Sequence, residues 1–480
     1  MTESPPTRVP PRLGLVLAAC CLGQFMVILD VSVVNVALPV IDDVLRFAPG
    51  SLQWVMIAYT IVFTGFLLLG GRLADLYGQR RVFLTGITVF TLASLVGGLA
   101  YDPATLITAR GLQGLGAAVM APATLTVLGT TFRDPTARAK AFGLWGAVAG
   151  GGGAVGVLAG GVITDLLSWR WILLVNVPIG VALFALTARA VTERRNDDDG
   201  RKLDVAGALS VTLGLIALVY GIVGTQHGGW GSVGVLVPLG LAAVLLAFFV
   251  VDQAKLAAQP LVPLAIFRNR SLSAANLVRL GSGVAMGSTF YFLTLLLQRG
   301  MGYTALQAGL AYLPLSIGIF AGARGIATSV PKYGPRPILV FGLALSAVGL
   351  GWLSLTDEHA TFQGGVLGPT LLIGIGVGVV MTASTTAATA NLPYQQAGLA
   401  SGLLNTTRQL GDAVGLAILV TIAAAHTAGP SVAATVSGYR LAFLVAGLVM
   451  VATIGAALAV PAKAKPRAAS PQAAPESAKA

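Results

Sequence analysis

The chain consists of successive apolar blocks of about 20 residues, separated by short segments of charged and turn-forming residues. A helix of about 20 residues is needed to cross the ~30 Å hydrocarbon core of a bilayer. Of the 480 residues, 55% are hydrophobic and only 10% are charged. Average soluble domains carry about 25% charged residues. The sequence therefore predicts an all-α polytopic membrane protein.

About fourteen spans are expected, grouped into two six-helix bundles with two helices inserted between them. The bundles cover 13–190 and 253–461, and the insert with its preceding loop covers 191–252. An N-terminal tail (1–12) and a C-terminal tail (462–480) complete the chain. The C-terminal tail is rich in Ala, Pro, Ser and Lys, which predicts that it is disordered. The expected spans are 13–39, 52–71, 82–100, 104–131, 140–164, 170–190, 204–224, 232–252, 272–297, 304–328, 337–357, 365–390, 398–426 and 438–461.

Basic residues concentrate in alternate loops, which places those loops and both termini in the cytoplasm by the positive-inside rule. The net charge of +12 then reflects orientation in the membrane, and no nucleic-acid partner is expected. The opposite loops hold few basic residues. The basic residues assigned to the cytoplasmic side include Arg72, Arg80, Arg81, Arg138, Lys140, Arg189, Lys255, Arg268, Arg270, Lys332 and Arg336.

Several classes of function are disfavoured by what the sequence lacks. It contains no Gly-Lys pair, so it has no phosphate-binding GxxxxGK[ST] loop for ATP. It has no GxSxG or HExxH motif, and Cys20 and Cys21 are adjacent within the first span. We therefore expect no enzyme activity, no cofactor and no metal site, and an ion gradient as the energy source.

A faint internal repeat relates the two bundles. The loop after the second span, Gly71–Arg81, has a counterpart at 327–336, with Gly78 matching Gly334 and Arg80 matching Arg336. Two pseudo-symmetric halves of this kind enclose a midplane cavity in transporters that work by alternating access.

Four segments together resemble the motifs of one family. These are the first-span segment Leu29–Pro39, the loop Gly71–Arg81, the fourth-span segment Arg110–Ala118 and the fifth-span segment Gly152–Gly161. The chain resembles the major facilitator superfamily, and within it the fourteen-helix drug:proton antiporters. The resemblance implies a monomeric transporter of the cell membrane that exports small amphipathic or lipophilic compounds, cations among them, in exchange for protons. An importer or facilitator of a small metabolite and a transport-inactive sensor are the alternatives.

Asp30 and Arg110 are the predicted proton-coupling residues. A charged side chain at the bilayer centre costs about 2.5–3.5 kcal/mol on insertion scales, so each needs a partner. At ~1.5 Å rise per residue, their depths from the outer end are roughly 14 and 9 Å, which is within the reach of an arginine. The alternative is a static buried ion pair or a snorkelling side chain.

The loop after the second span is the predicted cytoplasmic gate. Gly71 and Gly78 mark a tight turn, and Asp75, Arg80 and Arg81 supply charges that can pair with neighbouring helix ends. Leu76 and Gln79 stand where the family usually has basic residues. A solvated positive-inside loop is the alternative.

The fifth span carries the antiporter-type motif. Gly152, Gly156 and Gly160 repeat every four residues on one helical face, followed by Gly161, and allow close helix packing. Val157 replaces the proline usual in the family, which leaves the direction of transport open. Ordinary small-residue packing is the alternative.

Further polar residues are candidates for the substrate cavity. Arg408 and Asp412 are four residues apart on one helix face, where they either neutralise each other or leave Asp412 to attract a cationic group. Arg279 and Arg324 are expected to snorkel toward the cytoplasm. The remaining candidates are Asn35, Tyr59 and Gln113.

Overall fold

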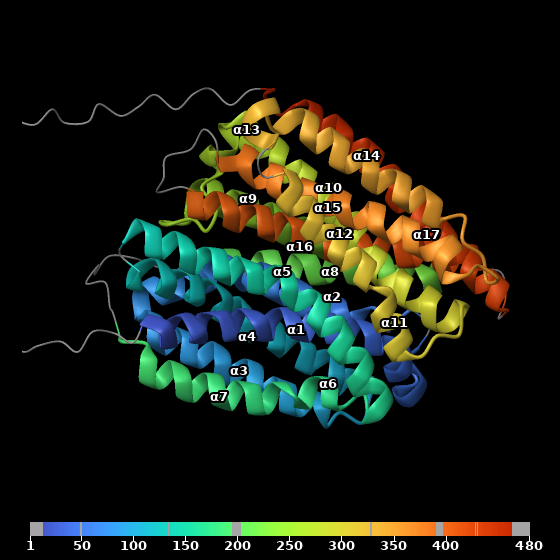
Figure 1. Cartoon of the computed structure of the whole chain (residues 1–480), viewed down its shortest axis with the longest axis horizontal. Helices are drawn as coiled ribbons and strands as arrows, with labels where there is room; N and C mark the ends of the chain where they lie inside the picture. The colour runs from blue at the N-terminus through green and yellow to red at the C-terminus, as the bar shows by residue number, and fades with distance from the viewer. Residues whose placement is uncertain are drawn as a thin grey trace, which may run out of the picture.

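The computed structural model describes residues 13–48, 50–132, 134–193, 203–326, 329–389, 397–427, 429 and 431–462. In this part of the chain fourteen helices are long and apolar enough to span a membrane. They form two bundles that lie side by side (Figure 1). The predicted N-terminal tail and residues 463–480 of the predicted C-terminal tail lie outside the described residues.

The first bundle is α1 (Leu13–Leu45), α2 (Trp54–Tyr77), α3 (Gln79–Gly98), α4 (Pro103–Thr131), α5 (Pro135–Leu166), α6 (Trp171–Leu174) and α7 (Asn176–Ala190). The second is α10 (Arg270–Leu295) with its π-turn Leu296–Gly300, α11 (Ala305–Ala311), α12 (Leu313–Ile326), α13 (Ser329–Tyr333), α14 (Pro335–Leu353), α15 (Gly368–Thr389), α16 (Ala397–His426) and α17 (Val432–Leu458). The inserted helices are α8 (Val205–Gly228) and α9 (Val233–Val251), and α9 continues as a π-turn to Leu256.

Two of the predicted spans are interrupted shortly before a proline. The span expected at 170–190 is divided into α6 and α7 at Val175, and the span at 304–328 into α11 and α12 at Tyr312. Pro178 and Pro314 follow these breaks, and a proline has no N–H for the carbonyl four residues earlier. By contrast, α1 continues past Pro39 to Leu45, as membrane helices often do when neighbouring helices support the backbone.

The internal repeat is visible in the backbone of the two corresponding loops. Gly78 precedes α3 with φ +95°, and Gly334 precedes α14 with φ +81°. Residues with a side chain rarely adopt such values, which explains why both halves have glycine at this point.

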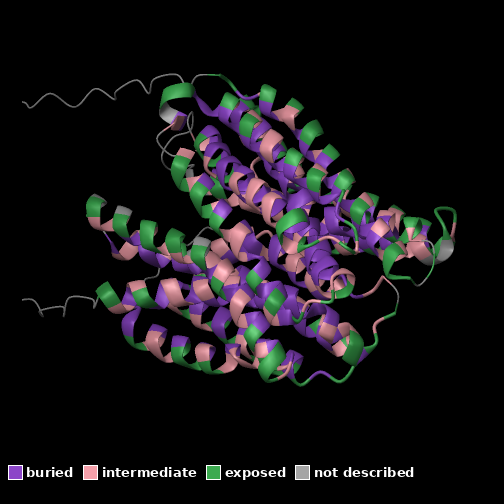
Figure 2. Ribbon diagram, turned by 45° about the vertical axis from the view of Figure 1, so that its right-hand side comes forward, coloured by how far each residue is buried: buried purple, intermediate pink, exposed green. Residues whose placement is uncertain are grey.

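The two bundles contact each other mainly at one end, where α1 and α5 end and α11 begins; we call it the closed end. Here Gln298 Nε2 donates to Val36 O at 2.6 Å. Asp165 accepts hydrogen bonds from the backbone N–H groups of Ala305 and Leu306. Toward the opposite, divergent end the bundles spread apart (Figures 1 and 2).

The packing around α5 also becomes looser from the closed end toward the divergent end. A Cβ atom on Gly161, near the closed end, would lie 2.7 Å from Ala305 O of the other bundle. On Gly143 or Gly146, near the divergent end, it would meet no atom within 4 Å. Figure 2 shows the buried residues concentrated inside each bundle and at the closed end.

The inserted helices have unequal positions. α8 contacts both bundles: Gly65 of α2 approaches Thr212, and Gln226 Nε2 donates to Thr421 Oγ1 of α16 at 3.1 Å. α9 packs on α8, and only 11% of its most apolar stretch is buried. The insert therefore adds one helix at the boundary between the bundles and one at the periphery.

Candidate functional site

The centre of the first bundle holds a buried ion pair between Asp30 of α1 and Arg110 of α4. Arg110 Nη1 lies 2.5 Å from Asp30 Oδ2, and the two residues are 1% exposed or less. Removing two charges from water is costly, and only good geometry with further hydrogen bonds offsets the desolvation. The structure supplies such hydrogen bonds.

Two side-chain amides complete the coordination of Asp30. Gln113 Nε2 and Asn176 Nδ2 each donate to Asp30 Oδ1 at 2.9 Å. Gln113 Oε1 accepts from Arg110 Nη1, and Gln113 Nε2 also lies 2.7 Å from Ser94 Oγ. Asp30 thus receives donors from α4 and α7, while α3 supports Gln113.

Arg110 is held from the side of α2. Its Nε donates to Val55 O at 3.0 Å, and its guanidinium carbon lies 4.5 Å from the centre of the Tyr59 ring. A cation over an aromatic face is attracted to the electron-rich ring. The Tyr59 hydroxyl is buried and has no hydrogen-bond partner in the described part of the chain.

Asn176 and Ser94 are members of this network that the sequence interpretation missed. Asn176 occupies the first position of α7, immediately after the break at Val175, which brings its side chain to α1. The available signal was an amide inside the apolar run Leu173–Pro178, which costs free energy in hydrocarbon unless it is paired.

The glycine face of α5 packs on the segment of α1 that carries Asp30. Cβ atoms on Gly152, Gly156 and Gly160 would lie 3.3 Å from Ile28, 2.7 Å from Ser32 and 2.9 Å from Val33, respectively. Val157 is buried, and its carbonyl approaches Gly309 of α11. The α5 helix therefore contacts the Asp30 segment and the second bundle at once.

The predicted gate residues make their described contacts within the first bundle. Arg80 donates to Ala188 O at 2.7 Å, and Arg81 lies 3.8 Å from Glu193. Gly71 packs near Pro122 of α4, and Gly78 lies against the Glu193 carboxylate. The side chain of Asp75 lies outside the described residues. The gating role of this loop stays a prediction.

The remaining predicted cavity residues occupy different places. Gln113 and Tyr59 belong to the Asp30 network, and both are buried in this conformation. Asn35 Nδ2 donates to Phe290 O of α10 at 3.2 Å, so Asn35 joins the two bundles. Binding of substrate by these three residues stays a prediction.

A second charged cluster lies between α10 and α16. Arg408 Nη1 is paired with Asp412 Oδ2 on α16. Arg279 of α10 is only 6% exposed, and the next residue, Leu280, packs with its carbonyl against Gly411, the neighbour of Asp412 in the chain. The prediction that Arg279 snorkels is therefore wrong, because its position on α10 directs it into the bundle beside Asp412. Arg324 is exposed near the end of α12, as expected for a snorkelling side chain.

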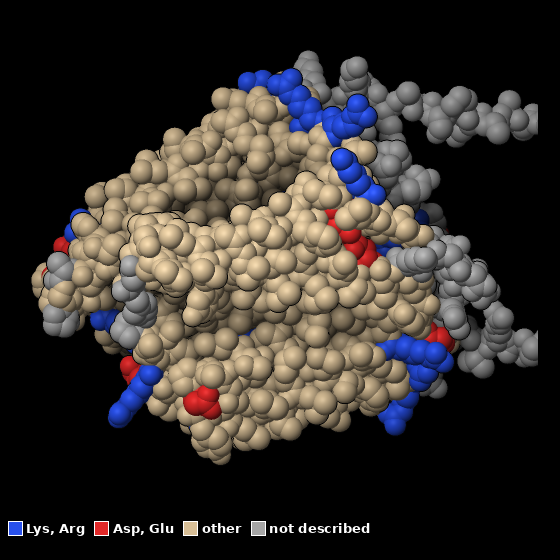
Figure 3. Space-filling view, turned by 180° about the vertical axis from the view of Figure 1, so that it is seen from behind, with Lys and Arg blue, Asp and Glu red and all other residues tan. Residues whose placement is uncertain are grey.

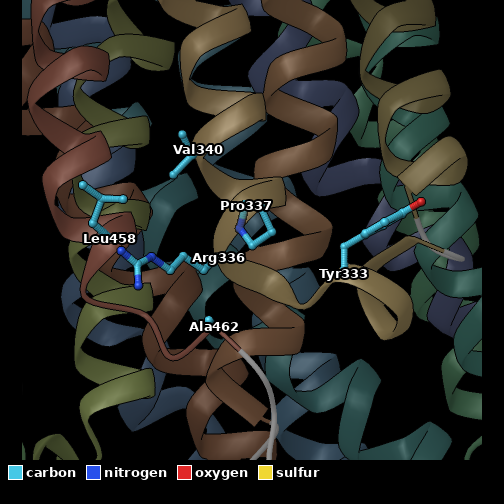
Figure 4. Close-up of a pocket in the computed structure, with 6 residues that line it drawn as sticks. All are labelled: Tyr333, Arg336, Pro337, Val340, Leu458 and Ala462. Atoms are coloured by element: carbon cyan, nitrogen blue, oxygen red, sulfur yellow. The ribbon is translucent and has the colours of Figure 1, made fainter.

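On the outer surface, a shallow hollow lies at the start of α14. It is lined by Tyr333, Arg336, Pro337, Val340, Leu458 and Ala462. In Figure 4, Arg336 extends toward Leu458 and Tyr333 points away from it.

Among the described residues, no three His, Cys, Asp or Glu side chains are grouped as a metal site requires. Figure 3 shows Lys and Arg gathered toward the two ends, with an uncharged band between them.

Comparison with known proteins settles the family. Residues 20–416 match the model of the Major Facilitator Superfamily. The chain belongs to the Major Facilitator Superfamily. The predicted family and fold class are confirmed, and with fourteen spans the chain falls in the fourteen-helix group of this superfamily. It is a multi-pass transporter of the cell membrane, not an enzyme.

Among curated relatives, a cephamycin export protein of Amycolatopsis lactamdurans is 44% identical over 94% of this chain and 93% of its own length. A puromycin resistance protein of Streptomyces alboniger is 39% identical over 92% and 91%. A solved structure of the POT family transporter PepTSo shares the fold at a TM-score of 0.66 with 16% identity, covering 94% of this chain and 99% of its own.

Proposed function

We propose that the protein exports small amphipathic or lipophilic compounds, such as drugs or natural products, in exchange for protons. Export is supported by its relatives, whose names include a cephamycin export protein, a puromycin resistance protein and a multidrug resistance protein of Mycobacterium tuberculosis. The observation that carries proton coupling is the fully buried Asp30, held by Arg110, Gln113 and Asn176.

A buried carboxylate of this kind can take part in a proton cycle. When Asp30 binds a proton, its attraction to Arg110 is lost, and the hydrogen bonds that join α1, α4 and α7 change together. Arg110 then needs another partner, because an isolated charge is unfavourable in a bundle interior. Proton binding on the outer side is thereby linked to a rearrangement that resets the transporter.

We further propose an orientation in the membrane and a monomeric transporting unit. The divergent end faces the cytoplasm, because Arg72, Arg80, Arg81, Lys332 and Arg336 lie there. Both termini are then cytoplasmic, the structure corresponds to an inward-facing state, and the monomer is the transporting unit. The proton gradient is the energy source, without a cofactor.

Reconstitution tests the coupling. Proteoliposomes that contain a pH-sensitive dye are exposed to puromycin or cefoxitin, and substrate-driven proton movement is recorded for the wild type, Asp30→Asn and Asp357→Asn. Asp357 is an exposed acid in the loop after α14 and serves as the matched control.

Asp30→Asn is expected to bind substrate while substrate-driven proton movement is lost, and Asp357→Asn is expected to behave as the wild type. Normal proton movement in Asp30→Asn excludes Asp30 as the coupling residue. Transport in everted and right-side-out vesicles decides between export and the importer alternative, which Val157 leaves open.

A further inference from the structure

The helices α10 and α16 are in close backbone contact around the second charged cluster. A Cβ on Gly283 would lie 2.1 Å from Arg408 O, and one on Gly287 would lie 3.0 Å from Asp412 Cα. A Cβ on Gly411 would lie 2.3 Å from Leu280 O. Such backbone contact fixes the positions of the charged side chains that these helices carry.

The cluster contains two guanidinium groups and one carboxylate. Asp412 is the only acidic residue within helices α10 to α17. It pairs with Arg408, while Arg279 is buried one residue before Leu280, whose carbonyl packs against Gly411, and its Nε has no hydrogen-bond partner among the described residues. The cluster therefore carries a net charge of +1. The attraction of a cationic group to Asp412, one of the sequence-based alternatives, is unfavourable here.

The cluster lies on helices that face the other bundle. α10 contacts α1 through Asn35 and Phe290, and a Cβ on Gly402 of α16 would lie 3.6 Å from Leu68 of α2. Figure 1 places α16 at the boundary between the bundles. The Arg408 side chain keeps 28% of its surface exposed, so a ligand between the bundles can reach it.

We propose that Arg279 and Arg408 bind a carboxylate of the exported compound, and that Asp412 holds Arg408 in position. A guanidinium group binds a carboxylate with two parallel hydrogen bonds, and one additional negative charge neutralises the cluster. Asp412 Oδ1 is also buried and has no hydrogen-bond partner in the described part of the chain, which favours a carboxylate with an N–H or O–H donor nearby. The assignment rests on the proposed export function and specifies its substrate class.

Calorimetry of the purified wild-type protein in detergent tests the assignment directly. The probes are two matched pairs, cefoxitin and its methyl ester and benzylpenicillin and its methyl ester, together with puromycin as an amine. We expect at least one acid to bind about tenfold more tightly than its ester, a difference of about 1.4 kcal/mol. The assignment is overturned if neither acid binds more tightly than its ester.

Substitutions of Arg279 test whether the substrate carboxylate binds at this cluster. Arg279→Gln is expected to weaken binding of the favoured acid about tenfold and leave binding of its ester unchanged, while Arg279→Lys keeps part of the affinity. Arg324→Gln removes an exposed arginine from α12 and is expected to have no effect. Equal loss of acid and ester binding in a folded Arg279→Gln protein contradicts a charge-specific role. If Arg279→Gln does not fold, the comparison of acid and ester on the wild type still decides.

Calorimetry in detergent measures substrate binding and does not require transport or a proton gradient. Acid selectivity without substrate-driven proton movement refutes the proposed exchange and retains the carboxylate site. Proton movement driven equally by acid and ester retains the exchange and refutes the carboxylate site.

Discussion

Asp30 is surrounded by three donors, and each contributes differently to its environment. Arg110 supplies the opposite charge, whereas Gln113 and Asn176 supply neutral N–H groups to the other carboxylate oxygen. Hydrogen bonds to a charged group are worth about 1.5–3 kcal/mol each, more than those between neutral groups. The position and hydrogen bonding of Asp30 therefore depend on the amides as well as on the arginine.

Asn176→Ala isolates the contribution of one amide. Loss of the hydrogen bond to Asp30 should destabilise the protein by about 1.5–3 kcal/mol and lower substrate-driven proton movement about tenfold. Thermal unfolding in detergent and the proteoliposome assay measure the two effects. Thr187→Ala, at a buried position further along α7, is the control. Similar effects of the two variants on proton movement would show that Asn176 has only a packing role.

Single residues were predictable from the sequence where a charge stood in an apolar run. Asp30 and Arg110 were found because hydrocarbon penalises an unpaired charge, and depth along each helix placed them within reach of each other. Arg279 was misplaced by the same reasoning, because depth alone does not tell which way a helix face points. Its burial depends on the close approach of α10 to α16, which only the packed structure shows.

Helix α5 has a glycine packing surface that contacts both bundles. Its glycines at 152, 156 and 160 contact α1, and the next residue, Gly161, contacts α11 in the other bundle. The spacing of these glycines predicted a close helix contact, but the sequence could not tell which helix they meet. The breaks at Val175 and Tyr312 were also missed, because hydropathy alone reads each region as one continuous span.

Gly160→Ala tests this surface. The added Cβ would lie 2.9 Å from Val33 Cα, a backbone atom that cannot move by a rotamer change, so a loss of about 1–3 kcal/mol is expected from overpacking. Thermal unfolding and passive proton leak into liposomes are the measurements. Gly240→Ala, on the peripheral α9 where a Cβ meets no atom within 4 Å, should be neutral or slightly stabilising. Equal melting temperatures and leak rates for both variants would show that the contact of α5 with α1 neither stabilises the protein nor limits proton leak.

The whole molecule is held in one conformation by contacts at the closed end. Arg299 of the second bundle pairs with Asp42 and lies 3.6 Å from Asp43 of the first. These side chains are partly exposed, and exposed ion pairs contribute about 0–1 kcal/mol each, so the closed end is held by several modest contacts. The two-bundle architecture itself was predictable from the number of spans and the weak internal repeat. The conformational state was not, because it depends on small differences between alternative contacts.

Arg299→Gln should shift the molecule toward opening at the closed end. Loss of up to about 1 kcal/mol changes the ratio of the two states by up to about fivefold. Spin labels at Leu166→Cys and Val432→Cys, in a Cys20→Ala and Cys21→Ala background, report the distance across this end. Arg440→Gln removes an arginine that bonds Ser354 O within the second bundle and serves as the control. An unchanged distance distribution in Arg299→Gln would mean that this ion pair does not hold the end closed.

The adjacent contacts of Gly160 and Gly161 have a mechanical consequence. Because consecutive residues of one helix rest on two different bundles, relative displacement of the bundles is smallest at this point, which acts as a fulcrum. Gly143 lies 18 residues away along α5, a lever arm of about 27 Å at ~1.5 Å per residue. A tilt too small to separate the backbones at the fulcrum is thereby amplified into a large opening at the far end of the helix.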